Sequence, residues 1–491
     1  MRATPVVALL RWVRLERVWA RLALWLLLPA LLCGWWALGR GVAYARLGLA
    51  YAAPLDGQEG MALWEASLLR SGAPLYQPPH PERFVSAPYP PLHPLLLAVL
   101  GEHGSHVFLM GRLLSLAAVL LIALVGGLLA HQVTRSRWAG ATSAVLLLSF
   151  VPLQLWALRI KPDPLGLALT VLGLWLVARW EAGRGLSHTL ILAALAFTLA
   201  HFTKQTLLAG PLAAATYLWL HDRRLALRWT ALTLALVGAS WLTLDLVTHG
   251  QYTYHIWILH KLPWYAHRFW KLAAQLRDAW PLMVLGLIGL GVCWRRPTVI
   301  NAYLLWAPAS LIGAGVTGSH HNHLLETGIA LALAGGQAAG LGLTRGGVLR
   351  LVAPVLIATQ LLVWRAPLPW FAGEFSPDPQ YTRYIEFIRA TPGEVLADDV
   401  GLLYAAGRAL RYDDPAAQGP AAALGLWDQQ RLVSEIRAGH FSAIILPIDV
   451  FADGIDDPAD RWTPEMLAAL REAYAIKFRD SLIIYAPKGS F

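Results

Sequence analysis

Residues 107–130 read VFLMGRLLSLAAVLLIALVGGLLA, an apolar run that carries a single charge, Arg112. An α-helix needs about 20 apolar residues to cross the hydrocarbon core of a bilayer, so this run is long enough to span one. Of the 491 residues, 57% are hydrophobic and 14% are charged, and the mean hydropathy is +0.49. Because a soluble domain carries about 25% charged residues, the composition indicates a membrane protein.

Ten further runs have the same apolar character. They lie at about residues 21–39, 138–158, 164–178, 188–202, 206–220, 229–247, 280–294, 298–317, 325–343 and 348–364. We therefore predict eleven membrane-spanning helices. A shorter run, residues 87–100, contains four prolines, which break the hydrogen bonds of a helix interior. It is also too short to span, and we expect it at the outer interface or as a re-entrant piece.

Basic residues set the orientation. With the Arg-rich start of the chain in the cytoplasm, alternation places the later basic clusters on the same side, as the positive-inside rule requires. These clusters are Arg135/Arg137, Arg179/Arg184, Arg223/Arg224/Arg228, Arg295/Arg296 and Arg345. A spanning segment at 87–100 would turn them all outward. The net charge of +10 is explained by these clusters, and we expect the lipid bilayer, not nucleic acid, as the partner of the basic residues.

This topology divides the chain into two domains. Residues 1–367 form the predicted membrane domain, with a long outer loop at 40–106 and a second, aromatic and basic outer segment at 248–279. Residues 368–491 have the composition of a soluble domain and face outward. Candidate strands at 394–398, 441–447 and 481–486 alternate with amphipathic helical stretches at 380–390 and 428–438. The fold class is a polytopic α-helical membrane protein with a C-terminal extracytoplasmic α/β domain.

Polar side chains gather at the outer ends of the predicted spans. They are Asp56, Glu59, Arg112, Arg159, Lys161, Asp163, His201, Lys204, Gln205, His320, His321, Asn322, His323 and Glu326. Ionisable residues at membrane depth are costly and often functional, although any one of them could be an interfacial anchor. Asp56 or Glu59 could act as a general base, or be a solvated charge at a helix start. Arg and Lys could hold a phosphate leaving group.

Residues 318–323 read GSHHNH, and Glu326 lies one helical turn beyond His323. Such nitrogen and oxygen ligands suit a divalent transition metal. The segment lacks HExxH or another defined ligand spacing. We favour hydrogen bonding to substrate or lipid headgroups over metal binding, and we predict no cofactor.

Four passages resemble the GT-C superfamily of polyprenyl-phosphate-sugar-dependent glycosyltransferases. They are DGQE at 56–59 with ASLLRSGAPLY at 66–76 and PYPPL at 88–92, GRLLS at 111–115, RIKPDPL at 159–165, and TKQ at 203–205 with NHLLE at 322–326. The bacterial branch that the chain resembles includes aminoarabinose transferases of lipid A, protein mannosyltransferase-like enzymes and rhizobial lipopolysaccharide transferases. The likeness extends over about residues 15–365 and agrees with an outward-facing soluble tail.

The resemblance implies that a polyprenyl-phosphate-linked sugar is transferred, with inversion, to an envelope lipid, glycan or protein at the outer face of the cell membrane. In such enzymes an acidic residue early in the first outer loop is the base. Many relatives have adjacent Asp and Glu, whereas Asp56 and Glu59 are separated here, so either could be the base. The implied phosphate-binding residues are Arg112, Arg159, Lys161, Lys204 and Lys261, and the implied substrate-binding residues are Asp163, Gln205, His321, Asn322 and Glu326.

A transporter or flippase for a lipid-linked or anionic solute is the alternative function. The basic outer turns would then form a binding vestibule. Inverted repeats would give matched halves with Gly- or Pro-broken spans at corresponding positions, and the sequence has no such halves.

The topology can be tested with a reporter that is active only in the cytoplasm. Fused after Phe491, it should be inactive, because the predicted spans place the tail from about residue 376 on the outer side. The same reporter fused after residue 224, within a predicted cytoplasmic cluster, should be active. Activity of the Phe491 fusion would overturn the predicted orientation.

Overall fold

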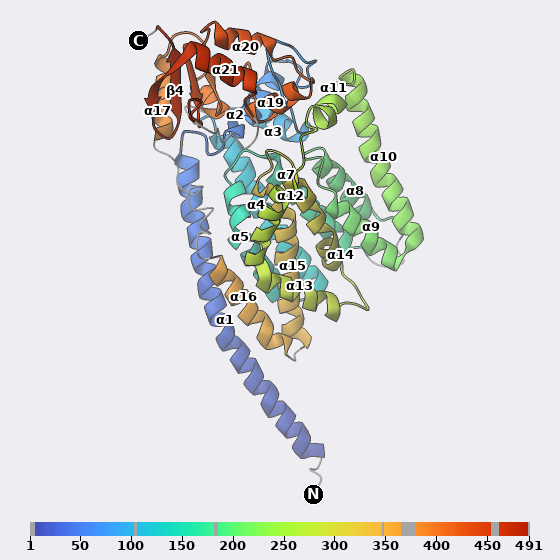
Figure 1. Ribbon diagram of the computed structural model, residues 1–491. Coiled ribbons are helices and arrows are strands. Elements are labelled where there is room, and N and C mark those ends of the chain that lie inside the picture. Colours follow the sequence, from blue (N-terminus) through green and yellow to red (C-terminus); the bar gives the residue numbers. More distant parts are fainter. Residues whose placement is uncertain are drawn as a thin grey trace.

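The computed structural model describes residues 5–102, 106–180, 185–345, 348–364, 380–452 and 461–489. A helical bundle carries a compact C-terminal domain at one end (Figure 1). Each of the eleven predicted apolar runs coincides with one helix or two consecutive helices. These are α1 (Pro5–Ala50), α4 (Leu109–Thr134), α5 (Arg137–Ser149), α6 (Val151–Trp156), α7 (Pro162–Ala178), α8 (His188–His201), α9 (Ala209–His221), α10 (Arg223–Val247), α13 (Trp280–Val292), α14 (Val299–Trp306), η3 (Ala307–Gly315), α15 (Leu325–Arg345) and α16 (Leu349–Val363).

Three helices of the described part are long and apolar enough to cross a membrane: Leu109–Thr134, Arg223–Val247 and His321–Thr344. Several other runs are interrupted. Run 138–158 breaks between α5 and α6, where Phe150 is extended and Pro152 follows, and run 298–317 changes from α14 to the 3-10 helix η3. The number of spans therefore stays a prediction, while the apolar helices themselves are confirmed.

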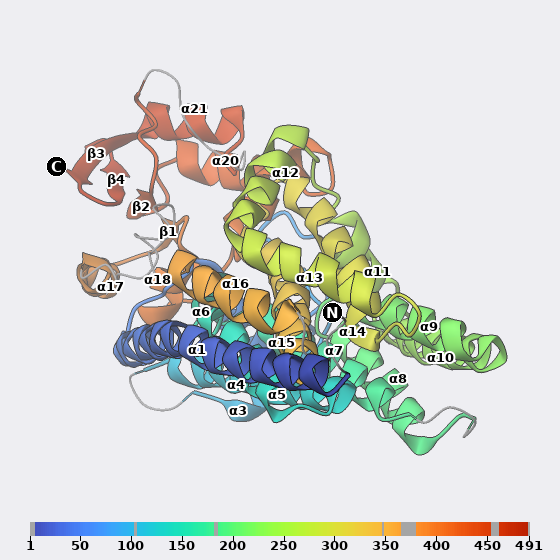
Figure 2. The same cartoon turned by 90° about the horizontal axis from the view of Figure 1, so that it is seen from below.

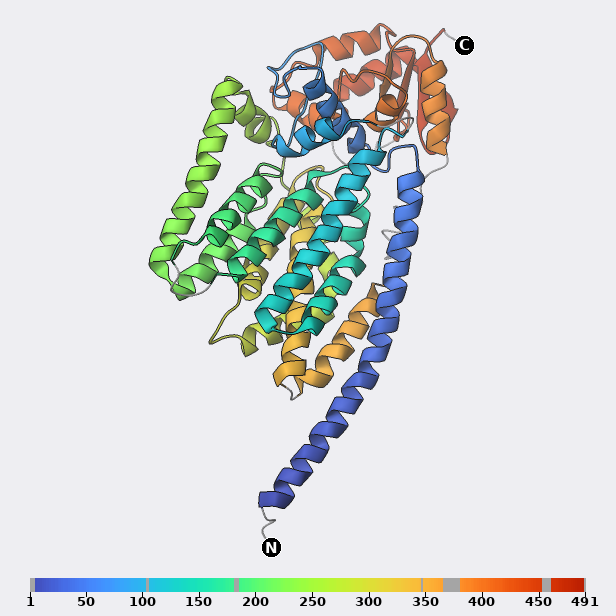
Figure 3. The ribbon, with the colours of Figure 1, turned by 180° about the vertical axis from the view of Figure 1, so that it is seen from behind.

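Helix α15 lies at the centre of the bundle. Its apolar window is 100% buried, whereas that of α10 is 6% buried, and α10 lies on the edge opposite α1 and α16 (Figures 2 and 3). Small residues allow the close packing of α15 on α5: a Cβ added at Gly336 would lie 2.8 Å from the carbonyl oxygen of Ala139. Glycine at such positions lets helix backbones approach each other.

We call the segment between α1 and α4 the first loop. Helix α1 continues to Ala50, so its last turns include the first residues of the outer loop predicted at 40–106. The first loop contains α2 (Gln58–Arg70) and α3 (Leu92–Leu100). At about 1.5 Å per residue, the nine residues of α3 are too few to cross a bilayer, in agreement with the expectation for 87–100.

The second predicted outer segment is also partly helical. It contains α11 (Gln251–Thr253), the π-helix η1 (Tyr254–Ile258), α12 (Ala266–Ala273) and the 3-10 helix η2 (Ala274–Ala279), and a further 3-10 turn, η4 (His321–Leu324), precedes α15.

The C-terminal domain, which we call the cap, is α/β as predicted. Its elements are α17 (Gln380–Ala390), β1 (Val395–Ala397), α18 (Val400–Ala405), α19 (Pro415–Ala423), α20 (Gln430–Arg437), β2 (Ala443–Leu446), α21 (Pro464–Ala473), β3 (Tyr474–Arg479) and β4 (Ile483–Pro487). The sheet order is β1-β2-β4-β3; β1 and β2 are parallel and the other pairs antiparallel. Strand β3, an edge strand with exposed residues, was not predicted. The expected domain boundary at 367/368 lies outside the described residues.

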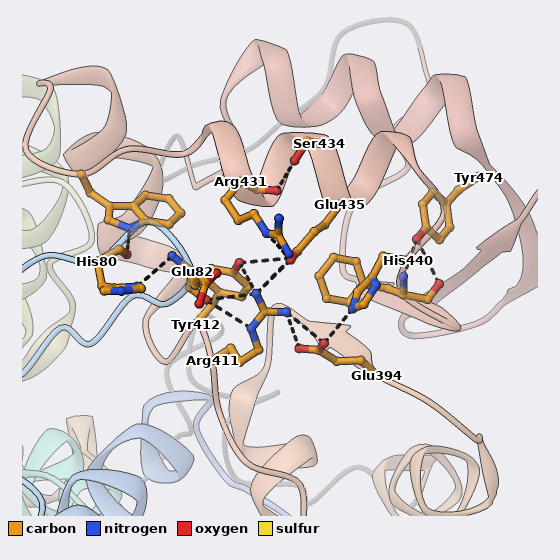
Figure 4. A network of polar contacts seen from close by, with 12 residues as sticks. His80, Glu82, Glu394, Arg411, Tyr412, Arg431, Ser434, Glu435, His440 and Tyr474 are labelled. Atoms are coloured by element: carbon orange, nitrogen blue, oxygen red, sulfur yellow. Dashed lines mark hydrogen bonds and ion pairs between the residues drawn. The ribbon is translucent and has the colours of Figure 1, made fainter.

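A polar network centred on Arg411 joins the first loop to the cap (Figure 4). The Arg411 guanidinium donates to the Glu394 carboxylate at 2.9 and 3.0 Å and to the Glu435 carboxylate at 3.1 Å. It also donates to the carbonyl oxygen of Glu82 at 3.0 Å. Because two carboxylates balance and orient this cation, it can hold a backbone carbonyl of the first loop without leaving an unpaired charge.

Backbone pairing continues this junction toward the bundle. Phe84 and Tyr412 form a parallel bridge: the N–H of Phe84 donates to the Arg411 carbonyl at 2.8 Å, and the N–H of Asp413 donates to the Phe84 carbonyl at 3.1 Å. The indole N–H of Trp427 donates to the His80 carbonyl at 3.0 Å. Residues 80–86, which include a turn at 81–82, thus pack as part of the cap.

Helices α2 and α18 also meet at two glycines. A Cβ added at Gly60 would lie 2.5 Å from the Cα of Gly401 and 2.7 Å from the carbonyl oxygen of Val400. These are backbone atoms, which cannot move aside like a flexible side chain. Overpacking of this kind costs about 1–3 kcal/mol.

Gly60→Ala should therefore lower the free energy of unfolding by about 1–3 kcal/mol, seen as a lower melting temperature in detergent. Gly238→Ala is the matched control, because a Cβ at this helical glycine of α10 would meet nothing within 4 Å and alanine favours helix. Equal melting temperatures for the Gly60→Ala variant and the parent would contradict the observed packing of α2 on α18.

Candidate active site

Two cavities lie where the bundle, the first loop and the cap meet, and a third, lateral cavity adjoins them and is lined by residues between Asp163 and Glu326. The cap cavity has a volume of about 590 Å³, the central cavity about 370 Å³ and the lateral cavity about 310 Å³. The cap and central cavities both have Asp56, Gln58 and Lys161 in their walls. The central and lateral cavities share residues of α7, the α8–α9 turn, η1, η3 and η4: Asp163, Lys204, Gln205, Thr206, Trp257, Gly313, Asn322 and His323. The cavity lining is therefore continuous from the cap into the bundle.

Asp56 lies where the cap and central cavities meet. It belongs to the turn before α2, and its Oδ1 accepts a hydrogen bond from the N–H of Gln58 at 3.0 Å. Lys161 Nζ lies 2.8 Å from Oδ1, and an Arg159 guanidinium nitrogen lies 3.9 Å from Oδ2. Burial alone would raise the pKa of Asp56, but Lys161 and Arg159 outweigh it and hold the pKa well below its usual range. Asp56 is therefore a carboxylate at neutral pH.

The two cations beside Asp56 come from the short connection between α6 and α7. Lys161 has an extended backbone and directly precedes Pro162, the first residue of α7. Its ammonium also donates to the Gln58 amide oxygen. The guanidinium of Arg159 lies over the ring of Trp156, 5.0 Å from the centroid. Both side chains are buried, so they place positive charge at the cavity with little competition from solvent.

A second buried ion pair lies deeper. Lys204, in the turn between α8 and α9, pairs with Asp163 in the first turn of α7. Lys204 also lies 6.0 Å from the ring centroid of Tyr89. The amide of Gln205 donates to the Pro88 carbonyl at 3.1 Å, which fixes the proline segment over the central cavity. Lys204, Asp163 and Gln205 are thus brought together as predicted, with Asp163 serving as the counter-charge of Lys204.

Arg112, a predicted phosphate-binding residue, does not line the three cavities. It is fully buried, and all five of its N–H donors are used. Two bonds go to the Glu59 carboxylate, and the others go to backbone carbonyls at the end of α1 and just after it: Gly48 at 2.8 Å, Tyr51 at 2.6 Å and Ala53 at 2.7 Å. A guanidinium so occupied has no donor left for a ligand.

Glu59 is likewise fully buried and saturated. Its Oε2 lies 2.8 Å from Arg112 and accepts from the N–H of Leu55 at 2.8 Å, while its Oε1 accepts from the N–H of Ile160 at 3.1 Å. The sequence left Asp56 and Glu59 open as alternative bases. The geometry favours Asp56, because Glu59 has no lone pair free to take a proton from a substrate.

The remaining predicted residues separate into two groups. Asn322 lines the central and lateral cavities, and Glu326 lines the lateral cavity, where the Tyr303 hydroxyl lies 3.4 Å from its Oε1. His321 is buried behind His320 and does not line the cavities, and Lys261 is exposed outside their walls. The predicted roles of His321 in substrate binding and of Lys261 in phosphate binding therefore lack support. Among the described residues, no group of three or more His, Cys, Asp or Glu could hold a metal ion.

The cap supplies a set of carboxylates that the sequence did not reveal as site residues. Asp398, Asp399, Asp413 and Asp414 line the cap cavity. Asp398 and Asp399 follow β1, and carboxyl ends of parallel strands are frequent ligand sites. The adjacent pairs Asp398–Asp399 and Asp413–Asp414 could therefore have indicated a ligand site from the sequence. It was missed because acidic pairs are common on the surface of soluble domains.

No protein-family model matches the sequence, and no curated protein matches it. Solved structures do. ArnT from Cupriavidus metallidurans in the apo state aligns with a TM-score of 0.58 at 14% identity, over 91% of this chain and 96% of that one. The chain therefore shares the fold of ArnT. The fold that the motif resemblance implies is confirmed.

Two further GT-C structures extend the comparison. ArnT bound to undecaprenyl phosphate aligns with a TM-score of 0.56 at 14% identity, over 92% of this chain and 98% of that one. The Archaeoglobus fulgidus oligosaccharyltransferase AglB, in complex with an inhibitory peptide and a dolichol-phosphate, aligns with a TM-score of 0.52 at 13% identity, over 84% of this chain and 69% of that one. Both the bundle and the cap are thus part of the shared architecture.

The structural role of the buried pair can be tested with a double-mutant cycle. Removal of one partner by Glu59→Gln or Arg112→Met leaves an unpaired buried charge, and each should cost about 3–5 kcal/mol of unfolding free energy. The double variant should lose less than the sum of the two, as measured by thermal unfolding in detergent. Single variants with unchanged melting temperatures would contradict a structural role.

Proposed function

We propose that this protein is an inverting glycosyltransferase of the cell membrane. It would transfer a sugar from a polyprenyl phosphate to an envelope acceptor on the outer face. The observation that carries this proposal is the Asp56 carboxylate at the meeting point of two cavities, with Lys161 and Arg159 beside it. The ArnT structure bound to undecaprenyl phosphate and the AglB structure in complex with a dolichol-phosphate support a lipid phosphate as the donor.

The lateral cavity suits the donor. Its walls combine apolar side chains, among them Leu167, Leu208 and Ile312, with Lys204. The apolar part would take the lipid chain, and Lys204, Lys161 and Arg159 would attract the phosphate. Negative charge grows on the phosphate oxygen as the glycosidic bond breaks, so preplaced cations stabilise the transition state more than the bound donor.

The acceptor would enter through the cap cavity. Asp56 would take the proton of its hydroxyl or amine as the nucleophile attacks the anomeric carbon, and the polyprenyl phosphate would leave from the opposite side. Displacement in one step inverts the anomeric centre. A base with a lowered pKa is fully ionised but has a low proton affinity, so it is effective only once attack has made the acceptor proton acidic.

Asp56→Asn should lower turnover by roughly 10²–10⁴-fold and leave donor binding largely intact, because it removes the proton acceptor while Lys161 and Arg159 stay in place. The readout is transfer of radiolabel from a polyprenyl-phosphate sugar, with donor affinity measured separately. Glu82→Gln is the matched control, since Glu82 is an exposed carboxylate of the same loop and should retain full activity.

Lys204→Met combined with Asp163→Asn removes the deeper pair without leaving an unpaired charge. This double variant should weaken donor affinity and slow transfer together, because the lost cation contacts the phosphate in both states. Full activity of both this variant and Asp56→Asn would overturn the proposed mechanism. Solute uptake into proteoliposomes without label transfer would favour the transporter alternative.

A further inference from the structure

The cap cavity has an excess of carboxyl groups. Its walls contain five: Asp56, Asp398, Asp399, Asp413 and Asp414. Two fixed cations line it, and each already has a partner, since Lys161 pairs with Asp56 and Arg461 with Asp398. Within the described part of the chain, Asp399, Asp413 and Asp414 have no ion-pair partner. This is unexpected in a chain with a net charge of +10.

Asp413 is the most constrained of these groups. Its side chain is fully buried and lines the cavity. Its Oδ1 accepts from the N–H of Ser86 at 2.9 Å, while its Oδ2 has no hydrogen-bond partner among the described residues. A buried polar atom without a partner destabilises the fold, and a ligand donor at this position would remove that penalty.

His260, which is linked to Asp414 through Ser86, does not supply the missing positive charge. Asp414 Oδ2 accepts from the Ser86 hydroxyl at 2.8 Å, and that hydroxyl lies 2.8 Å from Nε2 of His260. Burial lowers the pKa of His260 despite the nearby Asp414, so its imidazole is neutral at neutral pH. Burial, with the charges of Asp56 and Asp398, raises the pKa of Asp399 to about 8, and burial beside Asp414 raises the pKa of Asp413 well above its usual range.

We propose that the cap cavity binds the acceptor through an ammonium group held by Asp399, Asp413 and Asp414. This inference rests on the proposed function and names the chemical class of its acceptor. An ammonium offers three N–H donors and no acceptor, which suits carboxylate oxygens, including the unpartnered Oδ2 of Asp413. The ammonium is a recognition group and stays protonated, while a separate hydroxyl of the same molecule faces Asp56. The volume of about 590 Å³ lies within the usual range of ligand sites.

An anionic acceptor group would meet the opposite situation. A phosphate placed in this cavity would lie beside several carboxyl groups. Its negative charge would repel the carboxylates, and this repulsion is strong in a desolvated site. A neutral glycan would gain hydrogen bonds but no charge pairing. The preference should therefore run from cationic to neutral to anionic ligands.

Binding can be measured with the full-length protein in nanodiscs of zwitterionic lipid, with three sugars as probes. Tri-glucosamine carries ammonium groups, its N-acetylated counterpart is neutral, and glucose 6-phosphate is anionic. Tri-glucosamine should bind at least about tenfold more tightly than the neutral trisaccharide, a difference of about 1.4 kcal/mol. Asp413→Asn and Asp399→Asn should each remove most of this preference, because the amide keeps the shape but not the charge. Glu386→Gln, an exposed carboxyl of the cap, should leave it unchanged.

Equal affinity for the cationic and neutral trisaccharides, or tighter binding of the phosphorylated sugar, would overturn the inference. So would a preference that both Asp variants retain. If one variant fails to fold, the other variant and the preference of the parent protein still decide. Binding of undecaprenyl phosphate, measured on the same preparations, tests the proposed function separately. A protein that selects ammonium sugars but does not bind undecaprenyl phosphate would refute the proposed donor and leave the charge preference of the cap cavity standing.

Discussion

The buried ion pair of Glu59 and Arg112 holds the site together. Arg112, on α4, binds three carbonyls at and after the end of α1, and Glu59, on α2, binds Arg112 and the N–H of Ile160. Four segments of the chain therefore converge on one pair of side chains. Asp56 precedes Glu59 by less than one helical turn, and Lys161 follows Ile160 directly. The pair thus sets the register that brings Asp56 and Lys161 to 2.8 Å.

The bundle and the cap contribute different charged groups to the cavities. The bundle supplies Lys161 and Lys204, with Asp163, whereas the cap supplies the carboxyl groups of 398–399 and 413–414, with Arg461. Asp56, from the first loop, lies between the two sets. On the proposed function, this pattern would attract a phosphate to one side and a cationic acceptor to the other, and so orient both toward the same carboxylate.

This pattern depends on how the cap is docked. Phe84 pairs with Tyr412, and Ser86 binds both Asp413 and Asp414, so the first loop itself positions the carboxyl groups of the cap. The Gly60–Gly401 contact brings α18, and with it Asp399, against α2. Docking and site assembly therefore use the same residues, and a change that separates the cap from the first loop also dismantles the cap cavity.

The sequence by itself determined the apolar helices. Each apolar run avoids water, and in lipid its backbone must satisfy its own hydrogen bonds by forming a helix, so the residues of the run alone are enough to predict it. It also predicted Asp56, Lys161 and Lys204 as site residues, since charges next to apolar runs or early in an outer loop stand out, and all three lie in the wall of the central cavity. It could not separate Asp56 from Glu59: both are carboxylates with cations nearby, and the partner of Glu59 lies 53 residues away. Only the tertiary structure decided that Glu59 is saturated and Asp56 faces a cavity. It alone also revealed Asp399 and Asp413, because a carboxyl in a polar domain is unremarkable until folding places it in a cavity wall without a counter-charge.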